Sequence, residues 1–150
     1  MVKVGDEAPD FELKDQNGDL VKLSQLKGKK IILYFYPKDD TAGCTKEAIG
    51  FTDSLSAIED KNALVMGISA DSVASHKKFQ LKYKLKVTLL ADPEKKAIEA
   101  YGVWQRKLRF GIPRMGIVRT TVVINESGKV ETVWENVKID GHVETVCNRL

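Results

Sequence analysis

This sequence has few cysteines and no long apolar segment, and both absences narrow the class of protein. Only two cysteines, Cys44 and Cys147, occur among 150 residues, too few for the disulfide framework of a small secreted domain. No apolar run approaches the roughly 18–20 residues that a membrane-spanning helix needs. The N-terminal segment 1–11 also lacks the apolar stretch of a signal peptide. We therefore expect a cytoplasmic protein that does not reside in a membrane.

The chain also has no large excess of positive or negative charge. The chain has 24 basic and 21 acidic residues, which give a net charge of +3, and the two signs are interspersed apart from a lysine-rich patch over residues 76–86. Nucleic-acid-binding proteins usually carry a denser basic stripe with aromatic platforms, so we expect no nucleic-acid partner. With 43% apolar residues, the chain is long enough to bury a proper core. We expect a single domain over residues 1–150.

The apolar pattern predicts strands and helices in alternating order. Segment 11–23 alternates on either side of Asn17-Gly18, which predicts a hairpin. Further strands are expected at 30–36, 63–69, 87–91, 117–124 and 130–134. Helices are expected at 43–60, 72–83, 93–101 and 141–148, and segment 103–115 shows no clear period and is expected to be a loop. This order indicates an α/β fold with a mixed central β-sheet flanked by helices and an N-terminal β-hairpin.

Cys44 lies in the segment YPKDDTAGCTKE, at the start of a predicted helix that follows a buried strand. Sites of α/β proteins usually lie at the carboxyl ends of such strands. The first turn of a helix offers unpaired backbone N–H groups and the positive end of the dipole, and both favour a thiolate. The alternative is an inert cysteine that packs as a small hydrophobe. Because Cys44 precedes the apolar helix stripe that begins at Ala48, the local pattern favours a reactive thiol.

Arg119 and Thr41 could both act on the Cys44 sulfur. Strand alternation in GIVRTTVVI gives Arg119 a face that is otherwise apolar or β-branched, shared with Ile117, Thr121 and Val123. A guanidinium buried on such a face needs an anionic partner, which could be a carboxylate or a thiolate. Thr41, three residues before Cys44, could simply cap the helix, or it could face the sulfur and hydrogen-bond a substrate oxygen.

The spacing P-x-x-x-T-x-x-C formed by Pro37, Thr41 and Cys44, with Arg119 downstream, resembles that of the peroxiredoxins. The resemblance covers nearly the whole chain through four motifs, GDEAPDFEL at 5–13, FYPKDDTAGCTKEA at 35–48, YGVW at 101–104 and GIVRTTVVINESGKV at 116–130. The sequence is most similar to the bacterioferritin comigratory protein, or peroxiredoxin Q, group. The resemblance implies a thioredoxin-like fold and a thiol peroxidase that needs no metal or organic cofactor.

The resemblance also implies a role for each of these four residues. Cys44 would attack the O–O bond of hydrogen peroxide or an organic hydroperoxide and become a sulfenic acid. Thr41 would hydrogen-bond the peroxide oxygens, and Arg119 would stabilise the thiolate and the charge that develops on those oxygens. Pro37 would shield the sulfur from water. An external thiol reductant such as thioredoxin would reduce the sulfenic acid, and we expect a monomer or weak homodimer.

Two positions depart from the pattern of this group. Ala42 stands where proline is common, and Ile49 stands where members with a nearby resolving cysteine carry it. Cys147 is the second thiol, and its place on the apolar face of the last predicted helix favours a core position. A disulfide would require its Cα within about 7 Å of that of Cys44, or local unfolding. We therefore predict a one-cysteine cycle, with a Cys44–Cys147 bridge or an intermolecular Cys44 disulfide as alternatives.

Five further residues carry weaker expectations. Glu47 could orient Thr41 or Arg119, but we favour an interaction with the helix N-terminus. Trp104 and Phe110 could line an entrance or cover the core. His76, in a lysine-rich helix, is expected to be solvated, and His142 is expected in the first turn of the last helix.

Two other functions fit parts of the pattern. A Cys–His hydrolase would need an imidazole beside the nucleophile, and neither histidine follows a strand end near Cys44. A redox sensor or holdase could share the reactive thiol without turning over. The cysteines and histidines also lack the paired spacing of a zinc site, so we expect no metal.

Overall fold

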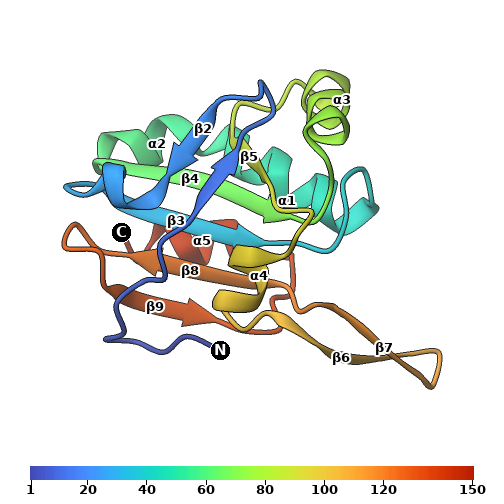
Figure 1. Cartoon of the computed structure of the whole chain (residues 1–150). Helices are drawn as coiled ribbons and strands as arrows, with labels where there is room; N and C mark the ends of the chain where they lie inside the picture. Colours follow the sequence, from blue (N-terminus) through green and yellow to red (C-terminus); the bar gives the residue numbers. More distant parts are fainter.

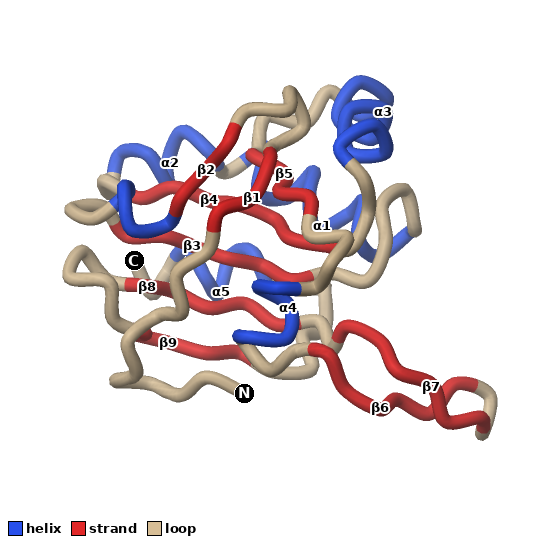
Figure 2. The backbone as a smooth tube through the Cα atoms, in the orientation of Figure 1, coloured by secondary structure: helices blue, strands red, loops and turns tan.

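The computed structural model describes the backbone of residues 1–150 and all side chains except that of Arg109. Seven strands form one mixed sheet in the order β2-β1-β5-β4-β3-β8-β9 (Figures 1 and 2). These strands are β1 (Glu12–Lys14), β2 (Leu20–Lys22), β3 (Lys30–Phe35), β4 (Ala63–Ser69), β5 (Thr88–Ala91), β8 (Thr120–Ile124) and β9 (Val130–Trp134). Strands β3, β4 and β5 are parallel, whereas β1 and β8 pair antiparallel with β5 and β3. The predicted mixed sheet and N-terminal hairpin are confirmed.

Helices cover both faces of the sheet (Figure 1). One face carries the helices α1 (Ala42–Asp53), α2 (Leu55–Asp60), α3 (Val73–Tyr83) and α5 (His142–Cys147). The other face carries α4 (Lys96–Ala100), together with the N-terminal segment and a 3-10 turn over Leu23–Leu26. None of the helices in the described chain has the length and apolar character that a bilayer crossing requires.

The alternation of side chains along β3 divides the core into two clusters. Ile31, Leu33 and Phe35 pack with α4 on one face, and Ile32 and Tyr34 pack with α1 on the other. All five side chains are buried, as expected for a parallel strand covered on both faces. The cluster under α1 also contains the side chain of Cys44.

One close contact sets how α1 lies on the sheet. The ring of Tyr34 lies over Gly67 of β4, where a Cβ atom would be only 2.6 Å from the ring carbon Cζ. Glycine at this position therefore lets the ring lie flat on the sheet. Phe51 of α1 stacks on the same ring, with centroids 4.8 Å apart. Helix α1 therefore packs on an aromatic layer, and this layer fits on the sheet because Gly67 has no side chain.

The predicted loop at 103–115 was wrong, because this segment forms a hairpin. Strands β6 (Trp104–Arg109) and β7 (Ile112–Ile117) make a separate two-stranded sheet that projects from the body (Figures 1 and 2). Its turn is the pair Phe110-Gly111, with φ of 52° and 75°, a conformation usually signalled by Asn-Gly or Asp-Gly. Phenylalanine hides that signal. The hairpin packs on the core only at its base, through Trp104 and Ile117, so its strands have no apolar period to detect.

The helix expected over 93–101 is shorter, because it begins only after Lys95, whose φ of 61° is left-handed. Two other predicted elements are interrupted. The helix expected over 43–60 is interrupted at Ser54, which follows Asp53; both residue types compete with the helix backbone for hydrogen bonds. The strand expected over 117–124 is split before β8, so Ile117 packs with the α4-side cluster while Val123 packs under α1. The predicted common face of Ile117 and Val123 is therefore wrong.

Candidate active site

Cys44 lies at the carboxyl end of β3, in the first turn of α1. The strand ends at Phe35 and the helix begins at Ala42. Cys44 therefore comes directly after the loop that joins the two elements. Thr41 is the N-cap, with an extended backbone at φ −96° and ψ 155°. The Cys44 side chain is only 1% exposed. The sulfur therefore faces a nearly dry environment beside the unpaired N–H groups of a helix start.

The guanidinium of Arg119 joins Cys44 to Glu47. Its Nη2 atom donates to the sulfur at 3.2 Å, and Nη1 donates to Oε1 of Glu47 at 2.8 Å. Gly43 leaves room for this contact, because a Cβ atom there would lie 3.3 Å from Nη2. Of the two anionic partners that the sequence allowed for Arg119, a carboxylate and the thiol, the structure provides both. The fixed fork of a guanidinium suits such a two-sided contact.

Glu47 is more than a helix N-terminal charge, so the favoured interpretation of this residue was wrong. Its side chain is 1% exposed, and among the described residues Oε2 has no hydrogen-bond partner. Burial raises the pKa of Glu47 to about 7, against the opposing effects of the Arg119 charge and hydrogen bond. Near neutral pH this carboxyl can therefore gain or lose its negative charge. When Glu47 is neutral, it offsets less of the positive charge that Arg119 directs at the Cys44 sulfur.

We expect Glu47→Gln to remove a pH dependence of stability. Because the folded-state pKa of about 7 lies above the ordinary 4.5, the folded protein holds this proton more tightly, so stability falls as pH rises from about 4.5 to about 7. The variant has no such carboxyl. Urea unfolding at pH 5 and pH 8 should show the wild type losing more stability than the variant across this interval. Equal losses in both proteins would contradict the assigned burial effect.

Thr41 does not cap α1 with its side chain, and among the described residues its hydroxyl bonds to a loop carbonyl and not to the sulfur. Its hydroxyl donates to the carbonyl of Lys38 at 2.8 Å, while its own carbonyl accepts the first helical bond from Thr45. The side-chain capping interpretation was therefore wrong. With its proton directed at Lys38, the Thr41 oxygen keeps lone pairs that can accept a hydrogen bond from a substrate.

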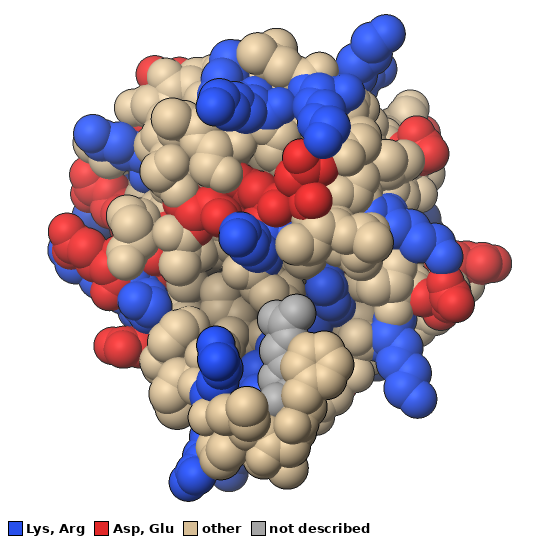
Figure 3. All heavy atoms as spheres, turned by 90° about the vertical axis from the view of Figure 1, so that its right-hand side faces the viewer, with Lys and Arg blue, Asp and Glu red and all other residues tan. Residues whose placement is uncertain are grey.

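Pro37 lies at the edge of a groove between the active-site loop and the β6–β7 hairpin. The groove has a volume of about 560 Å³, and Trp104 and Met115 are among its other lining residues. Lys and Arg side chains lie around a hollow on this end of the molecule (Figure 3). Trp104 also packs against the core, so it fulfils both alternatives. Phe110 is 93% exposed and does not cover the core.

The expectation for His76 was wrong, because this side chain is fully buried. Its Nδ1 atom lies 2.7 Å from a carboxylate oxygen of Asp39, in the active-site loop. The lysines around it suggested a solvated face. Its three-residue spacing from the buried Phe79 places it on the inward face of α3, and this was the signal in the sequence. The role of Asp39 had no such signal.

The second thiol lies at the other end of α1. Cys147 is partly buried, and burial raises its pKa, opposed by a hydrogen bond with Ser54. Ser54 follows the last residue of α1 and is ten positions beyond Cys44, which corresponds to about 15 Å along a helix. A direct disulfide needs Cα atoms within about 7 Å. This arrangement does not favour a bridge between the two cysteines without local unfolding.

His142 is the first residue of α5, as predicted. Its Nε2 atom lies 2.8 Å from the hydroxyl of Thr121, and burial together with the nearby Arg119 charge lowers its pKa. The ring is thus engaged with β8.

The sequence and the fold both match known proteins. The pattern of the AhpC/TSA family matches residues 4–133. Peroxiredoxin Bcp of Bacillus subtilis is 46% identical over 149 residues, covering 99% of this chain and 95% of that protein. Peroxiredoxin Bcp of Escherichia coli is 38% identical over 149 residues, covering 99% of this chain and 96% of that protein.

Two solved structures superimpose over almost the entire chain. The bacterioferritin comigratory protein of Xanthomonas campestris, studied for alkyl peroxide reduction, gives a TM-score of 0.91 at 30% identity, covering 99% of this chain and 95% of that chain. A mutant of Xylella fastidiosa PrxQ gives a TM-score of 0.93 at 31% identity, with the same coverages of 99% and 95%. These likenesses confirm the predicted thioredoxin-like fold.

Proposed function

This chain belongs to the AhpC/TSA family as a thiol-dependent peroxidase of the Bcp/peroxiredoxin Q group, and we propose that it works through a one-cysteine cycle centred on Cys44. Its substrates in this proposal are hydrogen peroxide and small organic hydroperoxides. The observation that carries the proposal is the 3.2 Å contact between the Arg119 guanidinium and the Cys44 sulfur. A cation directed at a nearly buried sulfur favours the thiolate, which is the nucleophile.

In the first step the Cys44 thiolate attacks one peroxide oxygen. An S–O bond forms while the O–O bond breaks, and the second oxygen leaves as alkoxide or hydroxide and takes up a proton. The sulfur is oxidised to sulfenic acid, and the peroxide is reduced to an alcohol or water. Negative charge moves from the sulfur to the departing oxygen, so the donors of Arg119 and the helix N-terminus stabilise it along this path.

Thr41 and Pro37 have supporting roles in the proposal. The Thr41 hydroxyl is oriented by its bond to Lys38, so its oxygen can accept the O–H of the incoming hydroperoxide and direct the attacked oxygen toward sulfur. Pro37 would limit the access of water from the groove side. This protection would matter because further oxidation of a sulfenic acid is irreversible without a dedicated repair enzyme.

In the second step an external thiol reduces the sulfenic acid. The incoming sulfur forms a mixed disulfide with Cys44 and releases water, and a second thiol then frees Cys44 and leaves as disulfide. The separation of Cys147 from Cys44 along α1 supports an external reductant, for which a dithiol protein such as thioredoxin is suited. Such thiols are abundant in the cytoplasm, so we extend the proposal to a cytoplasmic location.

We expect Cys147→Ser to keep at least about half of the peroxidase activity with dithiothreitol as reductant, since an external thiol attacks Cys44 directly. The measurement is steady-state peroxide consumption at equal protein concentration. A near-complete loss of turnover in a folded variant would show that Cys147 resolves the sulfenic acid, and the one-cysteine cycle would then be wrong.

Mass spectrometry of the protein after one equivalent of peroxide tests the cycle directly. We expect a monomer that has gained one oxygen on Cys44. A loss of two hydrogens would indicate a Cys44–Cys147 bridge, and a covalent dimer would indicate an intermolecular disulfide. Either product as the main species would overturn the proposed cycle while leaving the peroxidase chemistry intact.

A further inference from the structure

Two aspartates of the active-site loop, Asp39 and Asp40, have no part in the chemistry proposed for Cys44, yet both are tied to α3. The loop, residues 36–41, connects β3 with α1 and therefore carries Thr41 to its position beside the first turn. Asp39 is unusual because its side chain is only 4% exposed. A carboxylate is seldom buried unless hydrogen bonds compensate for the lost water.

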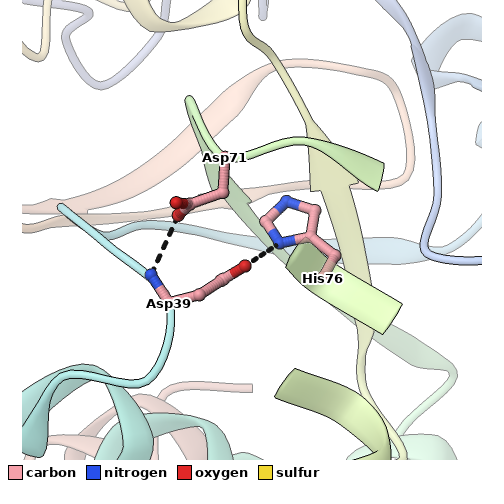
Figure 4. A group of neighbouring side chains, drawn as sticks. All are labelled: Asp39, Asp71 and His76. Atoms are coloured by element: carbon pink, nitrogen blue, oxygen red, sulfur yellow. Dashed lines mark hydrogen bonds and ion pairs between the residues drawn. The ribbon is translucent and has the colours of Figure 1, made fainter. Parts of the chain in front are cut away.

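Four groups hold Asp39 in place, and two of them, on Asp71 and His76, are drawn in Figure 4. The hydroxyl of Tyr36 donates to Oδ1 at 2.6 Å, the hydroxyl of Ser75 donates to Oδ2 at 2.8 Å, and Nδ1 of His76 lies 2.7 Å from Oδ2. The backbone N–H of Asp39 donates to the carboxylate of Asp71 at 2.9 Å. Asp39 is thus fixed to the residue that follows β3, to α3 and to the segment that precedes α3.

Both ring nitrogens of His76 face hydrogen-bond acceptors. Nε2 lies 3.0 Å from the backbone carbonyl of Leu90 in β5; a carbonyl can only accept, so Nε2 carries a proton. Nδ1 faces the Asp39 carboxylate, so a second proton lies between those two atoms. Ring and carboxyl together form a neutral unit whichever atom holds that proton. This contact, here named the Asp39–His76 latch, ties the active-site loop to the body of the protein.

The same cluster could also be considered as a metal centre. Asp39, Asp71 and His76 offer three ligand atoms that lie within 4.8 Å of one another. These atoms are already engaged, however, because Oδ2 of Asp71 accepts from Ser69 at 2.6 Å as well as from Asp39. A cation would have to displace the proton between Asp39 and His76. We therefore interpret the cluster as a hydrogen-bonded latch.

The backbone of Asp40 is strained, and contacts with α3 stabilise this conformation. Its φ is 57°, in the left-handed region that few residues other than glycine adopt. Its carboxylate accepts from Lys82 Nζ at 2.7 Å and from Tyr83 OH at 2.5 Å, in the last turn of α3. Helix α3 therefore holds the loop at two successive residues, through its first turns at Asp39 and its last turn at Asp40.

We propose that His76 is a positioning residue for peroxide reduction, which acts through the latch to hold Thr41 in its place at the start of α1, near Cys44. The inference rests on the roles proposed for those two residues. The hydrogen bond of Thr41 to Lys38 lies within the loop itself, so it cannot fix the loop to the body. With the latch open, the strained backbone relaxes and the threonine oxygen shifts, and a displacement of about 1 Å can slow a reaction by about 100-fold.

The test measures two rates on Cys44 in Asp39→Ala and His76→Leu. The first is single-turnover oxidation by hydrogen peroxide, followed by tryptophan fluorescence, and the second is alkylation by iodoacetamide. We expect the peroxide rate to fall by about ten-fold or more, while alkylation, which needs no Thr41, stays the same or rises. The double variant Asp39→Leu/His76→Leu buries no unpaired charge and should show no greater loss than either single change.

Asp140→Ala is the matched control. Asp140 forms an ion pair with Lys46, which lies in the first turns of α1, and the Asp140 side chain is 89% exposed. Because an exposed ion pair contributes little, we expect wild-type rates for this variant. A wild-type peroxide rate in any folded latch variant would overturn the inference, and so would a proportional fall of both rates. Failure of the proposed function is a separate result, since it would appear as turnover without Cys44.

Discussion

Peroxide turnover is expected to disappear when Cys44 is replaced by serine. Serine keeps the shape of the side chain but replaces a thiol, which ionises readily, by a hydroxyl that does not ionise near neutral pH. An alcohol also has no counterpart of the sulfenic acid intermediate. We expect a loss of at least about 10⁴-fold, as for the removal of other catalytic nucleophiles. Peroxide consumption with dithiothreitol, corrected for the reaction without protein, measures it.

The serine variant also offers a clean control for folding. Cys44 is buried in the cluster beneath α1, and an oxygen in place of sulfur should leave this packing intact. Its thermal midpoint should therefore stay close to that of the wild type, so lost activity can be assigned to chemistry. Residual turnover above the background would mean that the nucleophile lies elsewhere. Cys147 would then be the first alternative, and the double cysteine variant would decide.

The same assay separates a catalyst from a reactive sensor. A sensor consumes one equivalent of peroxide and then stops. Wild-type protein at a hundredth of the peroxide concentration should continue until the peroxide or the dithiothreitol is exhausted.

The parts of the structure predicted best from the sequence are those buried in a regular pattern. The strand at 63–69 was predicted with its exact bounds, because an unbroken apolar run flanked by polar residues has few other solutions. Arg119 was likewise identified as a residue that needs an anionic partner. Sequence reasoning could name the kind of partner but not choose between a thiol and a carboxylate, since this depends on the reach of one side chain across two elements.

The latch residues and the hairpin show what local pattern misses. Asp39 and His76 are 37 positions apart, and each residue type is common on protein surfaces. Only the fold brings them together, and only together does their burial make physical sense. The β6–β7 hairpin was missed for the opposite reason: it contributes little to the core, so no apolar period marks it. Long-range polar contacts and projecting segments are therefore the hardest features to predict from sequence.

The second large effect is expected for Arg119→Met. The substitution keeps much of the side-chain length but removes both donors, so the sulfur loses its cation and the departing oxygen loses a stabilising charge. Removing one such transition-state donor costs about 10²–10³-fold in rate, and a smaller thiolate fraction adds to this loss. Single-turnover oxidation measures the rate, and the ultraviolet absorbance of the thiolate measures its fraction. An unchanged thiolate titration would contradict the role given to Arg119.

Arg119→Met also leaves Glu47 buried without its partner, and this second effect must be separated from the first. Breaking a buried ion pair costs about 3–5 kcal/mol when a charge remains, but Glu47, whose pKa is already about 7, can escape the cost by taking up a proton. The variant should therefore be more stable at pH 6 than at pH 8. Adding Glu47→Met removes the charge, so stability should recover at both pH values. The peroxide rate should not recover, because no apolar side chain can replace a cation beside the sulfur. If the double variant regained both stability and rate, the contribution of Arg119 would be structural, and the electrostatic account of the Cys44 thiolate would have to be abandoned.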